Sequence, residues 1–196
     1  MALGDLLVIV DTCVLMRAGA LEFFVRIHMA GGCLLRWSSA IEEEFDGRIG
    51  RRPEGVELRC RRAMAAIPDA LVDVSEAQSS SAAALATDAD DVKIAAAALA
   101  LLAQVADDPD RWEGAQAVLL TDNVRHFDTR ALGTLGVRVL NCDEFAMLLL
   151  GRTEALVLRT VDPTREPGHL LEKMRSDGMT SSAAHMERRL RELGLM

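Results

Sequence analysis

Four positions along the chain place acidic side chains at one end of a hydrophobic segment. A carboxylate at the edge of a core is costly without a partner, because its charge loses hydration there. If the four segments meet in the fold, their acids need a shared cation, and oxygen ligands favour Mg²⁺ or Mn²⁺. The acids are Asp11 after Leu6–Val10, Glu42, Glu43 and Glu44 after residues 38–41, Asp88, Asp90 and Asp91 before an alanine-rich segment, and Asp122 after residues 117–120.

Short apolar segments alternate with longer helical patterns along most of the chain. The first segment, Leu6–Val10, is uniformly apolar and therefore predicts a strand that is buried on both faces. Alternation of strands and helices predicts an α/β fold, with a central parallel sheet between two layers of helices. The predicted strands are residues 6–10, 34–37, 71–74, 117–120 and 137–140.

Residues 88–106 form the clearest predicted helix, because after an acidic start they are nearly all Ala, Leu, Ile and Val. Ser38 or Ser39 is the expected N-cap of another helix, with the glutamates in its first turns as in a capping box. The Ser/Ala-rich segment 78–84 is predicted to be a loop. Further helices are expected within residues 12–27 after a turn at Gly19, from the arginine-rich segment to about residue 67, and over residues 143–150.

The acids of all four segments can face one edge of such a sheet. Ligands of parallel sheets bind beyond the carboxyl ends of the strands, and Asp11 and Asp122 each follow a predicted strand. The other acids stand near the starts of helices. Each also has a purely structural alternative, because Asp11 can cap a helix and acids in a first turn interact favourably with the helix dipole.

The four segments keep a defined spacing within themselves and a defined order along the chain. They read Val8-Ile9-Val10-Asp11-Thr12-Cys13-Val14-Leu15, then Ser38-x-x-Ile41-x-x-Glu44-Phe45, then Asp88-x-Asp90-Asp91-Val92-Lys93-Ile94-Ala95-Ala96-Ala97, then Leu120-Thr121-Asp122-Asn123-x-x-x-Phe127. In this order they resemble the motifs of the PIN domain family of metal-dependent ribonucleases. The resemblance is strongest to the VapC-like toxins of type II (VapBC) toxin–antitoxin pairs, and it spans about residues 6–128.

The resemblance implies a PIN-like fold, a Mg²⁺ or Mn²⁺ site, cleavage of single-stranded or structured RNA, a protein antitoxin and a homodimer. It assigns the metal ligands, and with them catalysis, to Asp11, Glu44, Asp91 and Asp122. Glu43 stays open as the alternative to Glu44, and a contribution from Asp90 also stays open. Asp88 is expected to be an N-cap. Lys93 departs from the commonest pattern, in which a polar or aromatic residue stands at that position.

A divalent ion would make a side-chain nucleophile unnecessary, because it acidifies a bound water and polarises the phosphate. The histidines are scattered and form no recognisable triad with Ser or Cys, and His126 is expected at the surface. A haloacid-dehalogenase-like phosphatase needs a second Asp two residues after the first, where this chain has Cys13. Two alternatives remain: a catalytically inactive PIN-like binding module, and a PIN nuclease of RNA processing that has no antitoxin.

The charge of the chain restricts its partners. It carries 30 acidic and 22 basic residues, and 23 of the acidic but only 14 of the basic residues lie within residues 1–150. This balance argues against strong non-specific binding to duplex nucleic acid, which requires many cations. The arginine-rich segment 48–62 is the exception, and it is expected to be either a solvated helix face or a contact for RNA or antitoxin.

Length and composition predict one PIN-like nuclease domain, residues 1–150, followed by a C-terminal helical extension, residues 151–196. Helices are expected in the extension at residues 152–161, 169–174 and 182–193. The four cysteines form no CxxC pair, which predicts free thiols. No segment is long enough to cross a membrane and the first residues lack a signal-peptide pattern, so a cytoplasmic location is expected.

Overall fold

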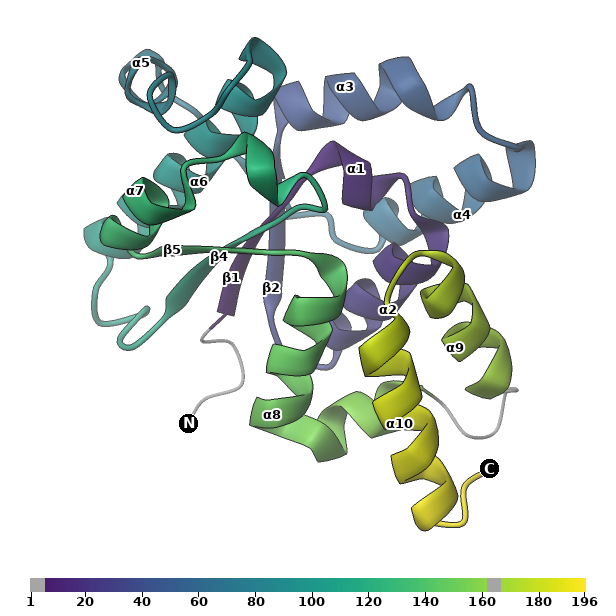
Figure 1. Ribbon diagram of the computed structural model, residues 1–196. Helices are drawn as coiled ribbons and strands as arrows, with labels where there is room; N and C mark the ends of the chain where they lie inside the picture. Colours follow the sequence, from purple (N-terminus) through teal and green to yellow (C-terminus); the bar gives the residue numbers. More distant parts are fainter. Residues whose placement is uncertain (1–5, 162–166) are drawn as a thin grey trace.

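The computed structural model describes residues 6–161 and 167–196, and it has a five-stranded, entirely parallel sheet at its centre (Figure 1). The strand order is β3-β2-β1-β4-β5. The α/β class and the parallel sheet predicted from the sequence are therefore confirmed. The strands are β1 (Leu6–Val10), β2 (Leu34–Ser38), β3 (Leu71–Val72), β4 (Gln116–Leu120) and β5 (Val137–Leu140).

Strand β1 lies in the middle of the sheet, and all five of its residues are buried. It pairs with β4 from Leu6–Gln116 to Val10–Leu120, so both strands end at the same level. The pairing continues for one more step, because the backbone N–H of Asp11 donates to the carbonyl of Leu120 at 3.0 Å. Asp11 and the residues that follow Leu120 therefore leave the sheet side by side.

Helices cover both faces of the sheet, which gives three layers (Figure 1). Helix α6 packs against β1, β2, β3 and β4, while α2 packs against β2, α4 and α8. The helices are α1 (Thr12–Leu15), α2 (Ala18–Met29), α3 (Ser39–Ile49), α4 (Glu54–Ala65), α5 (Glu76–Ala82), α6 (Ala89–Asp107), α7 (Thr129–Thr134), α8 (Cys142–Thr160), α9 (Pro167–Ser176) and α10 (Thr180–Glu192), with a 3-10 turn at Val124–His126.

Helix α6 is the alanine-rich helix predicted from the sequence, and Asp88 is its N-cap, as expected. The Asp88 side chain accepts a hydrogen bond from the backbone N–H of Asp91 at 3.0 Å. Residues 95–98 are all alanines with at most 1% exposure, because small side chains let the helix axis approach the sheet closely. This packing holds the acidic first turn of α6 at the carboxyl edge of the strands.

The prediction of a loop over residues 78–84 is wrong, because most of this segment belongs to α5. The helix begins with a capping box in which Ser75 accepts from the N–H of Gln78 and the Gln78 side chain accepts from the N–H of Ser75. Serines disfavour a helix interior because they compete for backbone hydrogen bonds. Here Ser79 and Ser81 instead donate to carbonyls one turn earlier in the helix.

One further boundary differs from expectation. The turn expected at Gly19 lies instead at Met16 and Arg17, between α1 and α2, and Gly19 is the second residue of α2. The two helices expected over residues 143–150 and 152–161 both form, and α8 comprises them with a break at Thr153, where φ is −146° and ψ is 53°. The remaining helices of residues 151–196, α9 and α10, pack against α2 and α8 respectively (Figure 1).

Two carboxylates attach these C-terminal helices to the rest of the protein. Asp177, in the turn between α9 and α10, accepts hydrogen bonds from the N–H groups of Gly19 and Ala20 at 2.8 and 2.9 Å, and so caps α2. In return, Asp143 of α8 accepts from the N–H groups of Ser181 and Ser182 in the first turn of α10. Each helix start is therefore completed by a residue that is distant in sequence.

The buried core is continuous and mostly aliphatic, and it includes Trp37. The four cysteines are free thiols, as expected. Among the described residues, no helix combines the length and the apolar character that crossing a membrane requires.

Replacing Gly19 with alanine should destabilise the protein, although alanine normally favours a helix over glycine by roughly 0.5–1 kcal/mol. A Cβ at Gly19 would lie 2.7 Å from Lys173 Cβ and 2.9 Å from the Lys173 carbonyl carbon, so α9 would have to move. We expect a loss of about 1–3 kcal/mol in the free energy of unfolding, measured by urea denaturation.

Gly55→Ala is the matched control, because Gly55 is also the second residue of its helix and a Cβ there would meet only Arg59 Nη1, at 3.9 Å. This variant should be neutral or slightly more stable than the wild type. Equal effects of the two substitutions would contradict the close packing of α9 on α2.

Candidate metal centre

Asp11 follows the central strand and is 3% exposed. It is the N-cap of α1, which is the helix-capping role that the sequence offered as an alternative to metal binding. Its carboxylate accepts a hydrogen bond from the backbone N–H of Cys13 at 3.2 Å. Its other oxygen accepts from the hydroxyl of Thr121 at 2.5 Å and from the thiol of Cys13 at 3.0 Å. Within residues 6–161 and 167–196, no Lys, Arg or His forms an ion pair with Asp11. Neutral hydrogen-bond donors compensate only part of the hydration that a buried carboxylate loses, so a cation beside it would be favourable.

The thiol of Cys13 remains protonated at neutral pH. Burial raises the pKa of this thiol to about 12, with a further contribution from the negative charge of Asp11. Cys13 therefore acts as a hydrogen-bond donor to Asp11 and not as a nucleophile or a thiolate ligand. It also accepts a hydrogen bond from the backbone N–H of Asp122 at 3.5 Å, which joins the ends of β1 and β4.

Asp122 lies just beyond β4 with 19% of its side chain exposed. One carboxylate oxygen accepts from the backbone N–H of Cys142, at the start of α8, at 3.3 Å. The other oxygen lies 2.7 Å from Arg17 Nη1. Arg17 comes from the segment between α1 and α2, so Asp122 has a cationic partner that nothing in its own motif predicts.

Glu44 is the one glutamate of its run whose side chain turns toward Asp11. It is 8% exposed and accepts from the hydroxyl of Thr12 at 3.0 Å. Arg48 and Lys93 form ion pairs with it at 2.7 and 3.3 Å. Glu43 is exposed.

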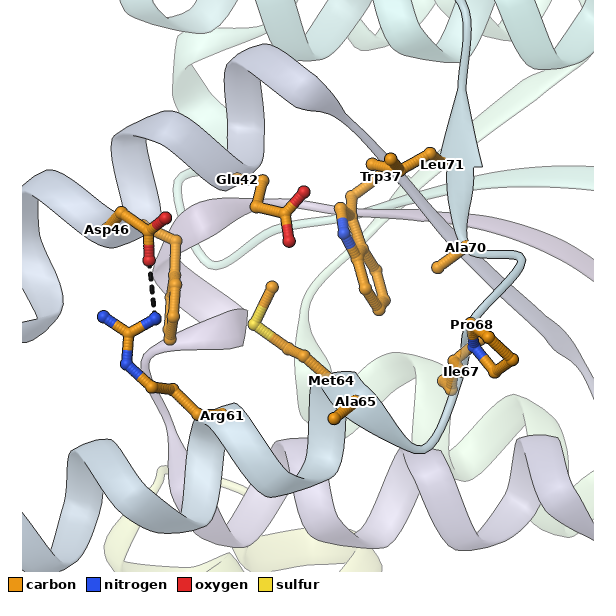
Figure 2. Close-up of a pocket in the computed structure, with 11 residues that line it drawn as sticks. Trp37, Glu42, Asp46, Arg61, Met64, Ala65, Ile67, Pro68, Ala70 and Leu71 are labelled. Carbon is orange, nitrogen blue, oxygen red and sulfur yellow. Dashed lines mark hydrogen bonds and ion pairs between the residues drawn. The ribbon is translucent and has the colours of Figure 1, made fainter.

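Glu42 points elsewhere. Figure 2 shows its carboxylate directed into a separate pocket of about 270 Å³ that is lined by residues of β2, α3 and α4, among them Trp37 and Met64. At one end of this pocket Arg61 pairs with Asp46, which lies one turn after Glu42 in α3, at 2.7 Å. The three consecutive glutamates thus face three different surroundings, and only Glu44 contacts the residue next to Asp11.

Asp91 is 6% exposed and lies beside a histidine that the sequence analysis assigned to the free surface. The Nδ1 atom of His126 is 3.1 Å from Asp91 Oδ2. The two meet because a β-bridge between Ala86 and Phe127 brings the start of α6 next to the segment after β4. The pKa of Asp91 is raised from 3.8 to about 6, mainly by burial and also by the neighbouring Asp88, while His126 opposes the shift.

Asp88, Asp91 and His126 form the one set of three among the described residues whose ligand atoms all lie within 4.8 Å of one another. The four acids predicted as ligands do not form such a set. Asp11, Glu44 and Asp122 are connected through Thr12, Cys13 and Thr121, whereas Asp91 belongs to the cluster with His126.

Two potential ligands, Asp88 and His126, were therefore not predicted as ligands from the sequence. Asp88 was considered only as an N-cap, a role that it also has. The available signal for His126 was its position four residues after Asp122, in the loop that follows a strand at the carboxyl edge of the sheet.

Carboxylates and one imidazole are the donors that the site offers to a metal. Carboxylate oxygens suit Mg²⁺ and Mn²⁺, and an imidazole extends the range toward softer divalent ions. Three of the four predicted ligands already have basic partners: Arg17 for Asp122, Arg48 and Lys93 for Glu44, and His126 for Asp91. These side chains offset the local negative charge, and a divalent ion would have to compete with them.

Comparison with known proteins adds no relative to this description. No family model matches the chain, and no curated protein or solved structure matches it significantly. The likeness to PIN ribonucleases therefore depends on the four sequence motifs alone.

Replacing Asp91 with asparagine should stabilise the metal-free protein at neutral pH. Because the pKa of Asp91 is raised to about 6, the folded protein retains a proton that the unfolded chain releases between about pH 4 and pH 6. The wild type therefore loses stability as the pH rises through this window. Asparagine does not titrate, so the variant avoids this loss of stability. The free energies of unfolding of variant and wild type should differ by on the order of 2–3 kcal/mol above pH 6, and the difference should vanish near pH 4.

Urea unfolding in EDTA at several pH values measures this difference. Asp90→Asn is the control, because Asp90 is an exposed neighbour in the same helical turn with 62% of its side chain accessible. It should change stability by less than about 0.5 kcal/mol at every pH. A difference between wild type and Asp91→Asn that does not depend on pH would show that Asp91 is not a buried, partly protonated acid.

Proposed function

We propose that this protein is a metal-dependent endoribonuclease that hydrolyses RNA phosphodiester bonds, and that it is the VapC-like toxin of a VapBC-type pair. One observation carries the proposal: Asp11 is a buried carboxylate at the end of the central strand, without an ion-pair partner in the described part of the chain. The order and spacing of the four motifs support the assignment to the PIN family. The α/β fold with its parallel sheet agrees with it.

Asp11 and Asp122 would hold the ion from adjacent strands, with Glu44 and Asp91 approaching from α3 and α6. A bound Mg²⁺ or Mn²⁺ would supply the Lewis acidity that activates water and neutralises charge on the phosphate. Thr121 would orient Asp11 through its hydroxyl, as residues behind metal ligands commonly do. Arg17 and Lys93 would turn from their carboxylates toward the phosphate, and His126 could pass a proton while Asp91 orients its ring.

The proposed partners are an RNA substrate, an antitoxin protein and a second copy of this chain in a homodimer. The RNA substrate follows from the proposed chemistry, while the antitoxin and the homodimer follow from the family resemblance alone. A PIN nuclease of RNA processing would use the same site without an antitoxin. A growth assay separates the two roles: expression of a toxin arrests bacterial growth, and Asp11→Asn relieves the arrest.

Purified wild-type protein should cleave labelled RNA in Mg²⁺ or Mn²⁺ and should be inactive in EDTA. Asp11→Asn should reduce the rate more than about 100-fold, because residues that merely orient metal ligands already contribute roughly 10- to 100-fold. Asparagine can still cap α1, so the fold should be preserved. The initial rate of cleavage on a sequencing gel, with circular dichroism as a check of folding, measures this effect.

Asp128→Asn is the matched control, since Asp128 is an acid that caps a helix of the same sheet edge through backbone N–H groups. It should cleave at the wild-type rate. Cleavage that persists in Asp11→Asn would assign the activity to another site or to a contaminant. If no variant cleaves RNA and calorimetry detects no binding of Mn²⁺, the protein is a PIN-like binding module and the proposal is wrong.

A further inference from the structure

Two hollows lie one after the other along helix α4, on the side of α2 and the C-terminal helices. The first has a volume of about 540 Å³ and is lined by residues before α2, around the start of α4, and in the turn between α9 and α10. The second has a volume of about 400 Å³ and is lined by α2, the later part of α4, and Lys173 of α9. Together they are called the α4 groove here.

The spacing of the α4 residues shows that the two hollows are neighbours. Val56 lines the first, and Arg59 and Ala63 line the second. Positions separated by three and four residues lie on one face of a helix. One stripe of α4 therefore forms a wall of both hollows, and this helix of 12 residues is about 18 Å long.

Basic residues dominate the α4 groove, although the whole chain carries a net charge of −8. Its two acids are already engaged, because Glu22 pairs with Arg26 and Lys173 while Asp177 caps α2. Three exposed arginines of the groove form no ion pair with any described residue: Arg52, Arg59 and Arg62. The basic residues that line the groove are Arg17, Arg26, Arg52, Arg59, Arg62 and Lys173.

The α4 groove reaches the candidate metal centre through Arg17. This side chain lines the first hollow, and its Nη1 lies 2.7 Å from Asp122 Oδ2 and 2.5 Å from the carbonyl oxygen of Asp177. One guanidinium thus contacts a proposed metal ligand and the turn between α9 and α10. A ligand that follows the groove would arrive at Asp122.

We propose that the α4 groove binds the sugar–phosphate backbone of single-stranded RNA and leads it to the metal centre, with the C-terminal helices as one wall. This inference rests on the proposed nuclease function. Arginine side chains bind phosphate through paired hydrogen bonds, and backbone contacts of this kind position a strand without reading its sequence. The metal centre at one end favours a nucleic acid over an acidic protein segment, which would not need to reach it.

Fluorescence anisotropy of a labelled single-stranded RNA, with EDTA present to prevent cleavage, tests the proposal. The double substitution Arg59→Gln and Arg62→Gln should weaken binding at least tenfold. It should also reduce the slope of log affinity against log salt by about 1.4, since each phosphate contact on a single strand contributes about 0.7.

The matched control is the double substitution Arg130→Gln and Arg138→Gln, which removes two exposed arginines from α7 and β5. It should leave affinity and salt slope unchanged. Equal losses in the two double variants, or no loss in either, would overturn the proposal. The proposal would also be wrong if the wild type failed to bind RNA. It would be wrong as well if an acidic peptide, but not RNA, bound in a way that depends on Arg59 and Arg62.

The same variants separate this proposal from the nuclease function. Unchanged RNA binding together with normal metal-dependent cleavage in Arg59→Gln, Arg62→Gln would refute the groove and leave the nuclease standing. Groove-dependent binding without cleavage in any metal would support the groove and refute the nuclease.

Discussion

The parallel pairing of β1 with β4 is the constraint on which the site depends. Both strands are buried and end in register at Val10 and Leu120, so the polar residues that follow them must emerge together. Side chains alternate between the two faces of a strand, and a shift of one residue would exchange them. The register therefore determines that Asp11 meets Thr121, and that the thiol of Cys13 lies against the backbone of Asp122.

Charge compensation is the second requirement, because the carboxyl edge of the sheet gathers several acids at low solvent exposure. Asp122, Glu44 and Asp91 each lie beside at least one basic side chain. Arg48 comes from the same helix as its partner Glu44, whereas the other basic residues come from other segments. Asp11 alone depends on neutral donors. The site thus combines three carboxylates that lie beside a basic side chain with one, Asp11, that is bound only by neutral donors.

The sequence predicted the elements better than the contacts between them. Uniform apolar runs identified the strands, and alanine content identified α6, because both are local properties. Segment α5 was missed because its serines favour turns, and its stability comes from a capping box whose pairing is not visible in composition. His126 was missed because its contact with Asp91 arises from a β-bridge between distant segments. The preference for Glu44 over Glu43 came from motif spacing, and only the burial of its side chain gives a physical reason for it.

Because the first turns of α2 and α10 are each capped by a residue from a distant segment, parts of the protein can be completed only late in its synthesis. The first turn of α2 is completed by Asp177, which leaves the ribosome about 160 residues after it. Arg17 likewise obtains its contact with the Asp177 carbonyl only at that stage. A nascent chain can therefore build the sheet early, while the surroundings of Asp122 stay unfinished until the segment around Asp177 has been synthesised.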